Sequence, residues 1–349
     1  QLEGHQVSIT ASIGIVLSGT HHDSADEILR DADATMYSAK AAGKNRYLLF
    51  DTAIGEKAQY RWQIEQDLRQ ALPRQEFQLN YQPIIESQTK TLIGFEVLLR
   101  WAHSQLGWIP PSEFIPIAED SGTICPIGMW VLQTSCQQMV EWQQHYHSSA
   151  PLALSVNLSL KQMLQSDLVK QIERVLLETG FAAEQLKLEI TETVFMENFE
   201  MVLAHCLALR QLGVQIYIDD FGTGYSSLSY LNKLPIDALK IDRSFISNPQ
   251  RDGNSWTIVQ TILALAREMG LDAIAEGVEN AEQMERLTQL GCNYLQGYFV
   301  AKPLRVGDAE ALVEAGSIAS HSDVILSVSP ISQISHNDSY PQTSLQHRS

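Results

Sequence analysis

Residues that could perform chemistry fall repeatedly at or near the ends of short apolar stretches. Most are carboxylates, accompanied by two amides and a lysine: Glu96, Asn157, Glu189, Glu192, Asp219, Asp220, Lys240, Asp242, Glu276, Glu279 and Gln296. Incidental surface carboxylates would not favour such positions. If these groups converge at one site, their repulsion and the cost of removing them from water favour a bound divalent cation.

The side-chain types in this set indicate which metal it would hold. The set is rich in carboxylate and amide oxygens and contains no cysteine or histidine, which selects a hard cation such as Mg²⁺ or Mn²⁺. There are enough ligands for two ions, and two metals about 4 Å apart suit in-line displacement at phosphorus. The residues therefore predict a metal-dependent hydrolase of a phosphate ester.

The apolar stretches that carry these residues predict an α/β fold, a (β/α)8 TIM-like barrel. The candidate strands are residues 77–85, 92–99, 152–158, 186–191, 214–219, 238–241, 272–275 and 294–299. Helical stretches separate them, as the alternation of a barrel requires. In such a barrel the carboxyl ends of the strands open on one face, so residues distant in sequence would share one mouth.

Two further segments flank the expected barrel. Residues 1–52 contain too little structure for an independent core and predict a truncated αβ unit. The chain opens at Gln1 rather than Met, which indicates a fragment. Residues 316–349 are rich in serine and have no helical period, so they predict a disordered tail without a functional motif.

The overall negative charge argues against polynucleotide and anionic-membrane partners. The chain of 349 residues has 24 Lys and Arg against 41 Asp and Glu, a formal net charge of −17. This balance disfavours a polynucleotide groove and docking on an anionic membrane, but it leaves open a small phosphate ligand held through metal ions.

No apolar run approaches the ~20 residues of a membrane span. The four cysteines lack metal or redox spacing and favour a cytoplasmic protein, although preceding sequence could carry a membrane tether.

Eight motifs in order make the chain resemble the EAL-domain phosphodiesterases of cyclic di-GMP, a bacterial second messenger. The motifs are YQPII, FEVLLRW, VNLS, LEITET, IDDFGTGYSSL, LKIDRSFI, AEGVE and LQGYFVAKPL. They cover roughly residues 58–314. Val97 departs from the tripeptide that names the family, where alanine stands. Because an apolar exchange leaves the Glu96 carboxylate in place, we expect little effect on metal binding.

The resemblance implies a role for each site residue. The implied metal ligands all offer side-chain oxygen, with Asp219 as the bridging ligand and Asp220 completing a second site: Glu96, Asn157, Glu189, Asp219 and Asp220. Glu276 is the implied general base or second-metal ligand, acting on the attacking water. Lys240 is implied to orient that water or to stabilise charge on the phosphorane.

Other residues are implied to bind substrate or to support the site. Gln82 and Arg100 would contact the phosphodiester and the guanine, and Gln296 would line the metal site beside the substrate. The implied supporting residues brace or permit the loop 220–227 or lie behind the catalytic groups: Glu192, Glu279, Gly222 and Gly224. The two glycines would allow a tight backbone turn.

Several of these residues have a structural alternative to a chemical role. Asn157 could cap the helix that follows its strand, Glu96 could pair with Arg100, and Lys240 could pair with Asp242. The shared placement at strand ends argues against all of these alternatives holding together.

Residues 1–52 separately resemble the C-terminal part of a GGDEF, or diguanylate cyclase, domain. The strings SITASIGIVL, DEILRDADATMYSAKAAGKNRY and LLFD carry this resemblance, and the GGDEF signature itself is absent. Lys40 and Arg46 would contact phosphate in an intact domain but lack partners here. We expect no cyclase activity from this chain.

The sequence therefore favours hydrolysis of cyclic di-GMP to linear pGpG with Mg²⁺ or Mn²⁺, and inhibition by Ca²⁺ because its looser coordination suits a rigid two-metal site poorly. The family also implies a homodimer. One alternative is a catalytically inactive EAL-type receptor that binds cyclic di-GMP and signals to a partner. A second alternative is a barrel enzyme that uses metal to stabilise an enolate, which the DDFGTGYSSL loop does not favour.

Overall fold

The computed structural model describes residues 10–17, 24–146, 151–223, 231, 233–247 and 255–315. The tail expected over 316–349 and the part of the expected loop from Gly224 onward lie outside the described residues.

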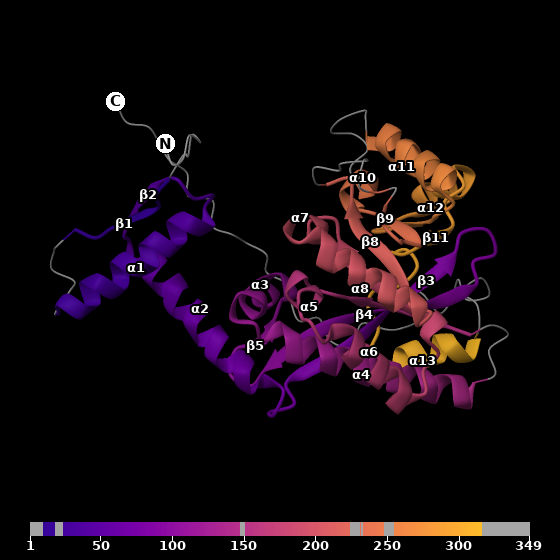
Figure 1. Cartoon of the computed structure of the whole chain (residues 1–349), viewed down its shortest axis with the longest axis horizontal. Helices are drawn as coiled ribbons and strands as arrows, with labels where there is room; N and C mark the ends of the chain where they lie inside the picture. Colours follow the sequence, from indigo (N-terminus) through magenta and orange to yellow (C-terminus); the bar gives the residue numbers. More distant parts are fainter. Residues whose placement is uncertain are drawn as a thin grey trace.

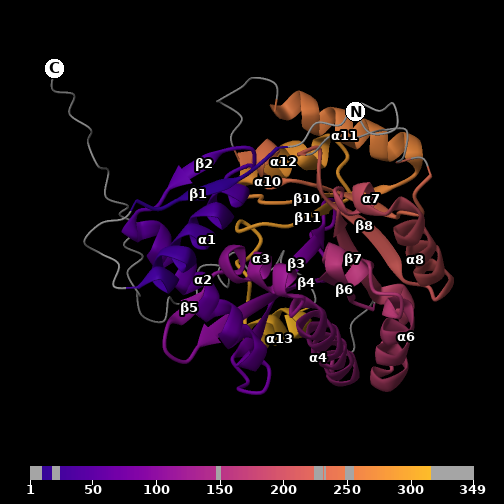
Figure 2. The same ribbon diagram turned by 60° about the vertical axis from the view of Figure 1, so that its left-hand side comes forward.

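Eight strands of the described chain form a closed barrel surrounded by helices (Figures 1 and 2). In chain order the barrel strands are β3 Phe77–Glu86, β4 Leu92–His103, β6 Ala153–Asn157, β7 Leu186–Thr191, β8 Gln215–Phe221, β9 Ala238–Ile241, β10 Asp272–Ala275 and β11 Tyr294–Leu295. Each strand pairs with its neighbours around the ring, and β3 closes the ring by pairing with both β4 and β11. The expected (β/α)8 barrel is confirmed.

The first barrel strand departs from the expected alternation of strands and helices. β3 runs antiparallel to both β4 and β11, and no helix separates β3 from β4. The expectation that all strands open on one face was therefore wrong for β3. The physical reason is the short turn over residues 87–91, because strands joined by a tight turn must pair antiparallel. The hairpin register places Gln82 directly opposite Glu96.

The last barrel strand is shorter than the stretch expected at 294–299. β11 ends at Leu295, and the chain then turns so that the Val300 N–H donates to the Gly297 carbonyl at 3.0 Å. Gly297 packs on the backbone of Val278, where a Cβ would lie 2.2 Å from the Val278 nitrogen. This close contact requires glycine and ends the strand.

Helices cover the outside of the barrel through their apolar faces. In α11 the buried residues Trp256, Val259, Ile262, Leu263 and Ala266 recur at helical spacing. The helices and short helical turns of the barrel are α3 Pro111–Ser121, α4 Ile124–His145, α5 Leu160–Met163, α6 Leu168–Thr179, η1 Ala183–Gln185, α7 Val194–Glu197, α8 Phe199–Gln211, α10 Arg243–Ser247, α11 Ser255–Met269, α12 Ala281–Gln289 and α13 Val306–Ala315. A short strand outside the closed ring, β5 Gly107–Ile109, pairs antiparallel with the end of β4.

A small αβ unit precedes the barrel. Its parallel strands β1 Ile13–Ile15 and β2 Tyr47–Leu49 flank the helix α1 Ala25–Ala41. Helix α2 Thr52–Ala71 leads from this unit to the barrel (Figure 1), where Ile64 and Leu68 join the main core. The helices in the described part of the chain are all too short or too polar to cross a membrane.

Strands β4 and β6 approach so closely at Gly94 that this position has no room for a side chain. A Cβ on Gly94 would lie 2.2 Å from the carbonyl oxygen of its partner Ala153. We predict that Gly94→Ala lowers the free energy of unfolding by about 1–3 kcal/mol, because backbone atoms of a paired strand must move. Urea denaturation of the purified chain measures the loss.

The matched control is Gly307→Ala in α13, where an added Cβ meets nothing within 4 Å. We expect it to leave the free energy of unfolding unchanged or to raise it by up to about 1 kcal/mol, because alanine favours a helix over glycine. Equal effects of the two substitutions would contradict the close approach of β4 and β6.

Candidate functional site

The buried ammonium of Lys240 lies among four carboxylates at one end of the barrel. Lys240 comes from β9 and is 1% exposed. Its Nζ atom lies 2.5 Å from Glu189 Oε2 on β7 and 2.5 Å from Glu276 Oε1 after β10. Asp219 Oδ1 on β8 is 3.3 Å away and Glu96 Oε2 on β4 is 3.5 Å away. Four segments distant in sequence therefore deliver negative charge to one cation.

The parallel strands explain why these groups meet. Strands β7, β8, β9 and β10 are consecutive neighbours in the ring, and alternate residues of each strand face the barrel interior. Glu276 follows the last residue of β10 and its N–H donates to the Ile241 carbonyl at 3.1 Å. Lys240 itself pairs with four carboxylates, so the alternative of a structural pair with Asp242 is wrong. Asp242 instead accepts from the Ser244 N–H at 3.0 Å.

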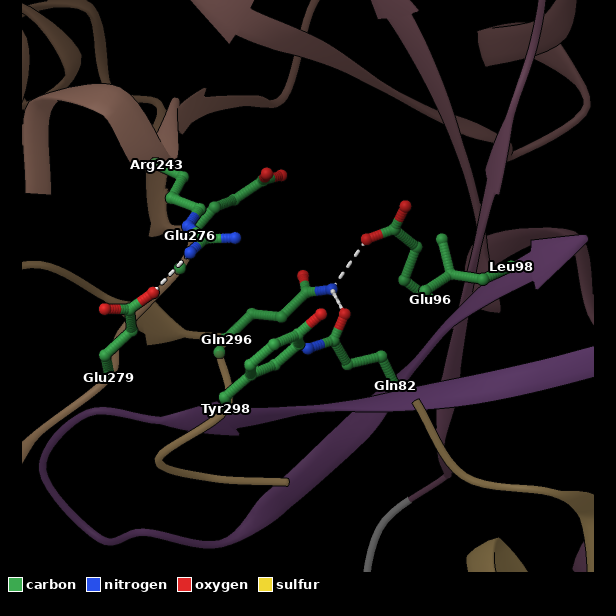
Figure 3. A pocket seen from close by; sticks show the side chains of 10 residues that line it. Gln82, Glu96, Leu98, Arg243, Glu276, Glu279, Gln296 and Tyr298 are labelled. Carbon is green, nitrogen blue, oxygen red and sulfur yellow. Dashed lines mark hydrogen bonds and ion pairs between the residues drawn. The ribbon is translucent and has the colours of Figure 1, made fainter. Parts of the chain in front are cut away.

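Two amide side chains donate to the carboxylate of Glu96, and a third amide accepts from one of them. Asn157 Nδ2 donates to Glu96 Oε1 at 2.7 Å, and Gln296 Nε2 donates to Glu96 Oε2 at 2.6 Å. Gln296 Nε2 also donates to Gln82 Oε1 at 3.2 Å (Figure 3). Asn157 does not cap the following helix, because Ser159 accepts the hydrogen bond from the N–H at that helix start.

Burial and crowding shift the titration of the carboxylates. Burial raises the pKa of Glu189 to about 8, with Lys240 opposing and the charges of Glu96 and Asp219 adding to the shift. Burial also raises the pKa of Glu276 well above its ordinary value. For Lys240, burial alone would lower the pKa, but the surrounding carboxylates raise it well above its ordinary value. The ammonium therefore stays charged, and one positive charge faces four acidic groups.

The chain turns sharply directly after Asp219. Asp220 adopts the left-handed conformation with φ +53°, and Gly222 follows with φ +93°. Such a backbone is uncommon for an aspartate and is found at turns and functional sites. Burial, then the charges of Asp219 and Asp242, raise the pKa of Asp220 to about 6. The turn places a fifth carboxylate next to Asp219 and within electrostatic reach of Lys240.

The donor set fits a hard divalent cation by its chemistry. The candidate ligands are all oxygen donors: Glu96, Asn157, Glu189, Asp219 and Asp220. Oxygen Oε1 of Glu189 is buried and has no hydrogen-bond partner among the described residues, which is costly for a carboxylate. Across the described ranges no three acidic, histidine or cysteine side chains are arranged to hold a metal, because the carboxylates turn to Lys240 instead.

A cavity of about 220 Å³ opens beside this cluster. Of the residues expected from the sequence, several line it: Gln82, Glu96, Glu276, Glu279 and Gln296 (Figure 3). Arg243 and Tyr298 also line it, and sequence reasoning did not find them. Both lie in motifs already singled out, and Arg243 follows Asp242 at the end of β9, so placement at a strand end would have revealed Arg243.

The remaining residues that the sequence predicted for the site lie around the Lys240 cluster and the cavity. Arg100 is half-buried on β4 and its Nη1 donates to the Leu99 carbonyl at 2.9 Å. Burial lowers the pKa of Arg100, and Tyr298 and Glu96 oppose that shift. Within the described chain, Glu96 and Arg100 form no ion pair within 4 Å. Glu192 is half-buried in the turn after β7.

Comparisons with known protein families match two parts of the chain. The model of the EAL domain matches residues 65–303. The model described as diguanylate cyclase, GGDEF domain, matches residues 1–46.

Individual proteins and structures show the same similarity. The chain is 43% identical over 304 residues to the bifunctional diguanylate cyclase/cyclic di-GMP phosphodiesterase MucR of Pseudomonas aeruginosa, covering 87% of this chain and 44% of MucR. It is 36% identical over 314 residues to the cyclic di-GMP phosphodiesterase NbdA of the same organism, covering 90% of this chain and 38% of NbdA. The chain thus spans less than half the length of these relatives.

Among solved structures, the PaMucR phosphodiesterase in complex with c-di-GMP matches with 44% identity and a TM-score of 0.68, covering 71% of this chain and 99% of that chain. The EAL enzyme Bd1971 with cAMP and cyclic di-GMP bound matches with 35% identity and a TM-score of 0.70. That match covers 75% of this chain and 72% of Bd1971.

Removing the Lys240 ammonium from the carboxylate cluster has a predictable cost in stability. We expect Lys240→Met to lower the free energy of unfolding in EDTA by about 3–5 kcal/mol, because buried carboxylates lose their partner. We expect Mn²⁺ to recover part of that loss, since a divalent cation would neutralise the same groups. Thermal unfolding with EDTA and with Mn²⁺ measures both effects.

Lys187→Met is the matched control, because Lys187 is another largely buried lysine of the barrel but, among the described residues, has no carboxylate within 4 Å. Its Nζ donates to the Glu184 carbonyl at 3.0 Å and to the Gln215 side chain. Recovery by Mn²⁺ that is equal in the two variants would contradict a special role for the Lys240 cluster.

Proposed function

Because the chain belongs to the EAL-domain family and carries a GGDEF-domain remnant at its N-terminus, we propose that it is a metal-dependent phosphodiesterase that hydrolyses cyclic di-GMP to linear pGpG. The observation that carries this proposal is the cluster of oxygen ligands, Lys240 and Glu276 beside a cavity at one end of the barrel. The complexes of PaMucR and Bd1971 with cyclic di-GMP support the choice of substrate.

The chemistry requires one exchange of bonds at phosphorus. A water oxygen bonds to one phosphorus of the cyclic dinucleotide, the P–O3′ bond breaks, and the released 3′ oxygen takes up a proton. The ring opens to a linear dinucleotide that keeps a 5′ phosphate, so atoms and charge balance without an oxidant or reductant.

The residues that would hold Mg²⁺ or Mn²⁺ are the five oxygen donors of the cluster: Glu96, Asn157, Glu189, Asp219 and Asp220. When bound, the metal supplies positive charge against the negative charge that develops at phosphorus. To coordinate through oxygen, Asn157 must turn its amide, since Nδ2 now faces Glu96. The hydrogen bonds of Gln82 and Gln296 fix the Glu96 network from the opposite side.

Two residues act on the reacting atoms. The Glu276 carboxylate lies at the cavity and is placed to accept the proton of the attacking water. Lys240 contacts Glu276 and holds it in position, and its ammonium would stabilise negative charge on the pentavalent phosphorus. Arg100 would contact the phosphodiester or the guanine.

The proposal extends to the organisation of the chain. We divide it into a GGDEF remnant at 1–52, the phosphodiesterase barrel at 58–314 and a tail at 316–349. Glu192 would brace the loop 220–227, in which Gly222 already adopts φ +93°, and Glu279 would support the site from behind the catalytic groups. The protein would work as a cytoplasmic homodimer in bacterial second-messenger signalling, with no polynucleotide partner.

We predict that the purified chain converts cyclic di-GMP to pGpG in Mg²⁺, and that Glu96→Gln lowers the rate at least about 100-fold. The substitution keeps the size of the side chain but removes the charge that would hold metal. Chromatography of the nucleotides measures the product.

The matched control is Glu285→Gln on the exposed side of α12, where Glu285 accepts a hydrogen bond from Gln289 and lies outside the cavity lining. It should retain the wild-type rate. Tight binding of cyclic di-GMP without turnover by the wild type would instead favour an inactive receptor.

We also predict that EDTA abolishes hydrolysis and that added Mg²⁺ or Mn²⁺ restores it. Ca²⁺ should inhibit, because its larger and more variable coordination shell suits a compact site poorly. Rates after metal exchange provide the test, and full activity in EDTA would refute metal dependence.

A further inference from the structure

Arg243 lies at the rim of the cavity, where its side chain packs over Gly277, the residue after Glu276 of the acidic cluster. It is the first residue of α10 and comes three positions after Lys240. Its side chain lines the cavity and remains 55% exposed. A cationic group at this place has no role in the catalytic scheme above.

Three neighbours hold the guanidinium of Arg243 in one orientation. Nη2 donates to Glu279 Oε1, and Nε donates to Ser247 Oγ at 3.3 Å. The guanidinium carbon lies 5.8 Å from the centroid of the Tyr298 ring, within the range of a cation–π contact. Figure 3 shows Arg243 against Glu279 at the edge of the cavity. These three contacts fix the guanidinium at the edge of the cavity that Arg243 lines.

The backbone leaves room for this arrangement at Gly277. A Cβ on Gly277 would lie 2.2 Å from Cγ of Arg243, and Gly277 has φ +65°. The aliphatic stem of Arg243 therefore passes directly over the glycine. Without a glycine here, the arginine would have to leave its place beside the cavity.

The donors of the guanidinium are only partly used. Of its five N–H groups, the described residues accept from Nε and once from Nη2. Nη1 has no hydrogen-bond partner within the described part of the chain. A fork of free N–H groups matches the oxygens of a phosphate.

The cavity therefore carries charges of both signs. Glu96 and Glu276 of the Lys240 cluster line it. Arg243 also lines it, and both Arg243 and Lys302 approach the ring of Tyr298, each at 5.8 Å from its centroid. A dianionic ring with two phosphodiesters needs a second cationic group, because the metal of the acidic cluster would hold only one of them.

We propose that Arg243 binds the second, non-scissile phosphodiester of the cyclic dinucleotide, with Glu279 and Tyr298 holding the guanidinium towards it. This inference rests on the proposed function. It makes Arg243 a specificity residue that distinguishes a cyclic substrate with two phosphodiesters from a linear dinucleotide with one.

Equilibrium binding in Ca²⁺, without turnover, tests this assignment. We expect Arg243→Gln to weaken binding of cyclic di-GMP about 10- to 100-fold, the range for loss of a charged hydrogen bond. Binding of linear GpG, which has the same guanines but one phosphodiester, should change less than about threefold. The matched control Arg174→Gln, an exposed position on α6, should affect neither ligand.

Turnover in Mg²⁺ adds a second readout. We expect Arg243→Gln to raise KM for cyclic di-GMP about 10- to 100-fold while kcat stays within about threefold. Glu279→Gln should raise KM less, because it loosens the arginine without removing its charge.

The outcomes separate this assignment from the proposed function. Equal weakening of both ligands by Arg243→Gln would assign the residue to guanine or to folding and overturn the inference. Unchanged binding of cyclic di-GMP would also overturn it. A wild-type chain that binds but does not hydrolyse would refute the proposed reaction, while the binding comparison would still test Arg243.

Discussion

The contact between Lys240 and four carboxylates, of which Glu96 and Glu189 are buried, is the interaction on which the rest of the site depends. Burial raises the pKa of Glu189 and of Glu276, and the charges of Glu96 and Asp219 add to both shifts. One ammonium compensates part of the cost of this burial. The remaining negative charge makes the site suitable for divalent cations. The uncompensated negative charge, which destabilises the folded protein, is thus also what would bind the metal.

The reversed strand β3 contributes to the same site in a way that a regular barrel could not. Because β3 and β4 form a hairpin, Gln82 stands opposite Glu96 in the register. Gln82 accepts from Gln296, and Gln296 donates to Glu96. The hairpin therefore links the two ends of the barrel sequence, β4 and the segment after β11, through one line of hydrogen bonds. This line fixes a carboxylate that the cation alone would hold weakly.

Much of the fold and of the site follows from local sequence. The strands of 77–86, 186–191, 238–241 and 272–275 agree with the expected stretches closely, because buried strands read as short apolar runs between turns. The direction of β3 and the early end of β11 were not predicted. The direction of β3 follows from the short turn between residues 86 and 92, which is local and could have been inferred from the sequence. The early end of β11 depends on the contact of Gly297 with Val278, and a single sequence carries no direct record of such a contact.

The sequence by itself determined the chemical types available to this protein: oxygen ligands, one lysine and one further glutamate at the ends of apolar stretches, in motifs that resemble the EAL family. Only the tertiary structure decided how they combine. It placed Lys240 among the four carboxylates, set Asn157 on Glu96, and put Arg243 with Glu279 at the rim of the cavity. The physical reason is that charge interactions depend on distance and burial, and barrel closure sets both quantities between residues far apart in the chain.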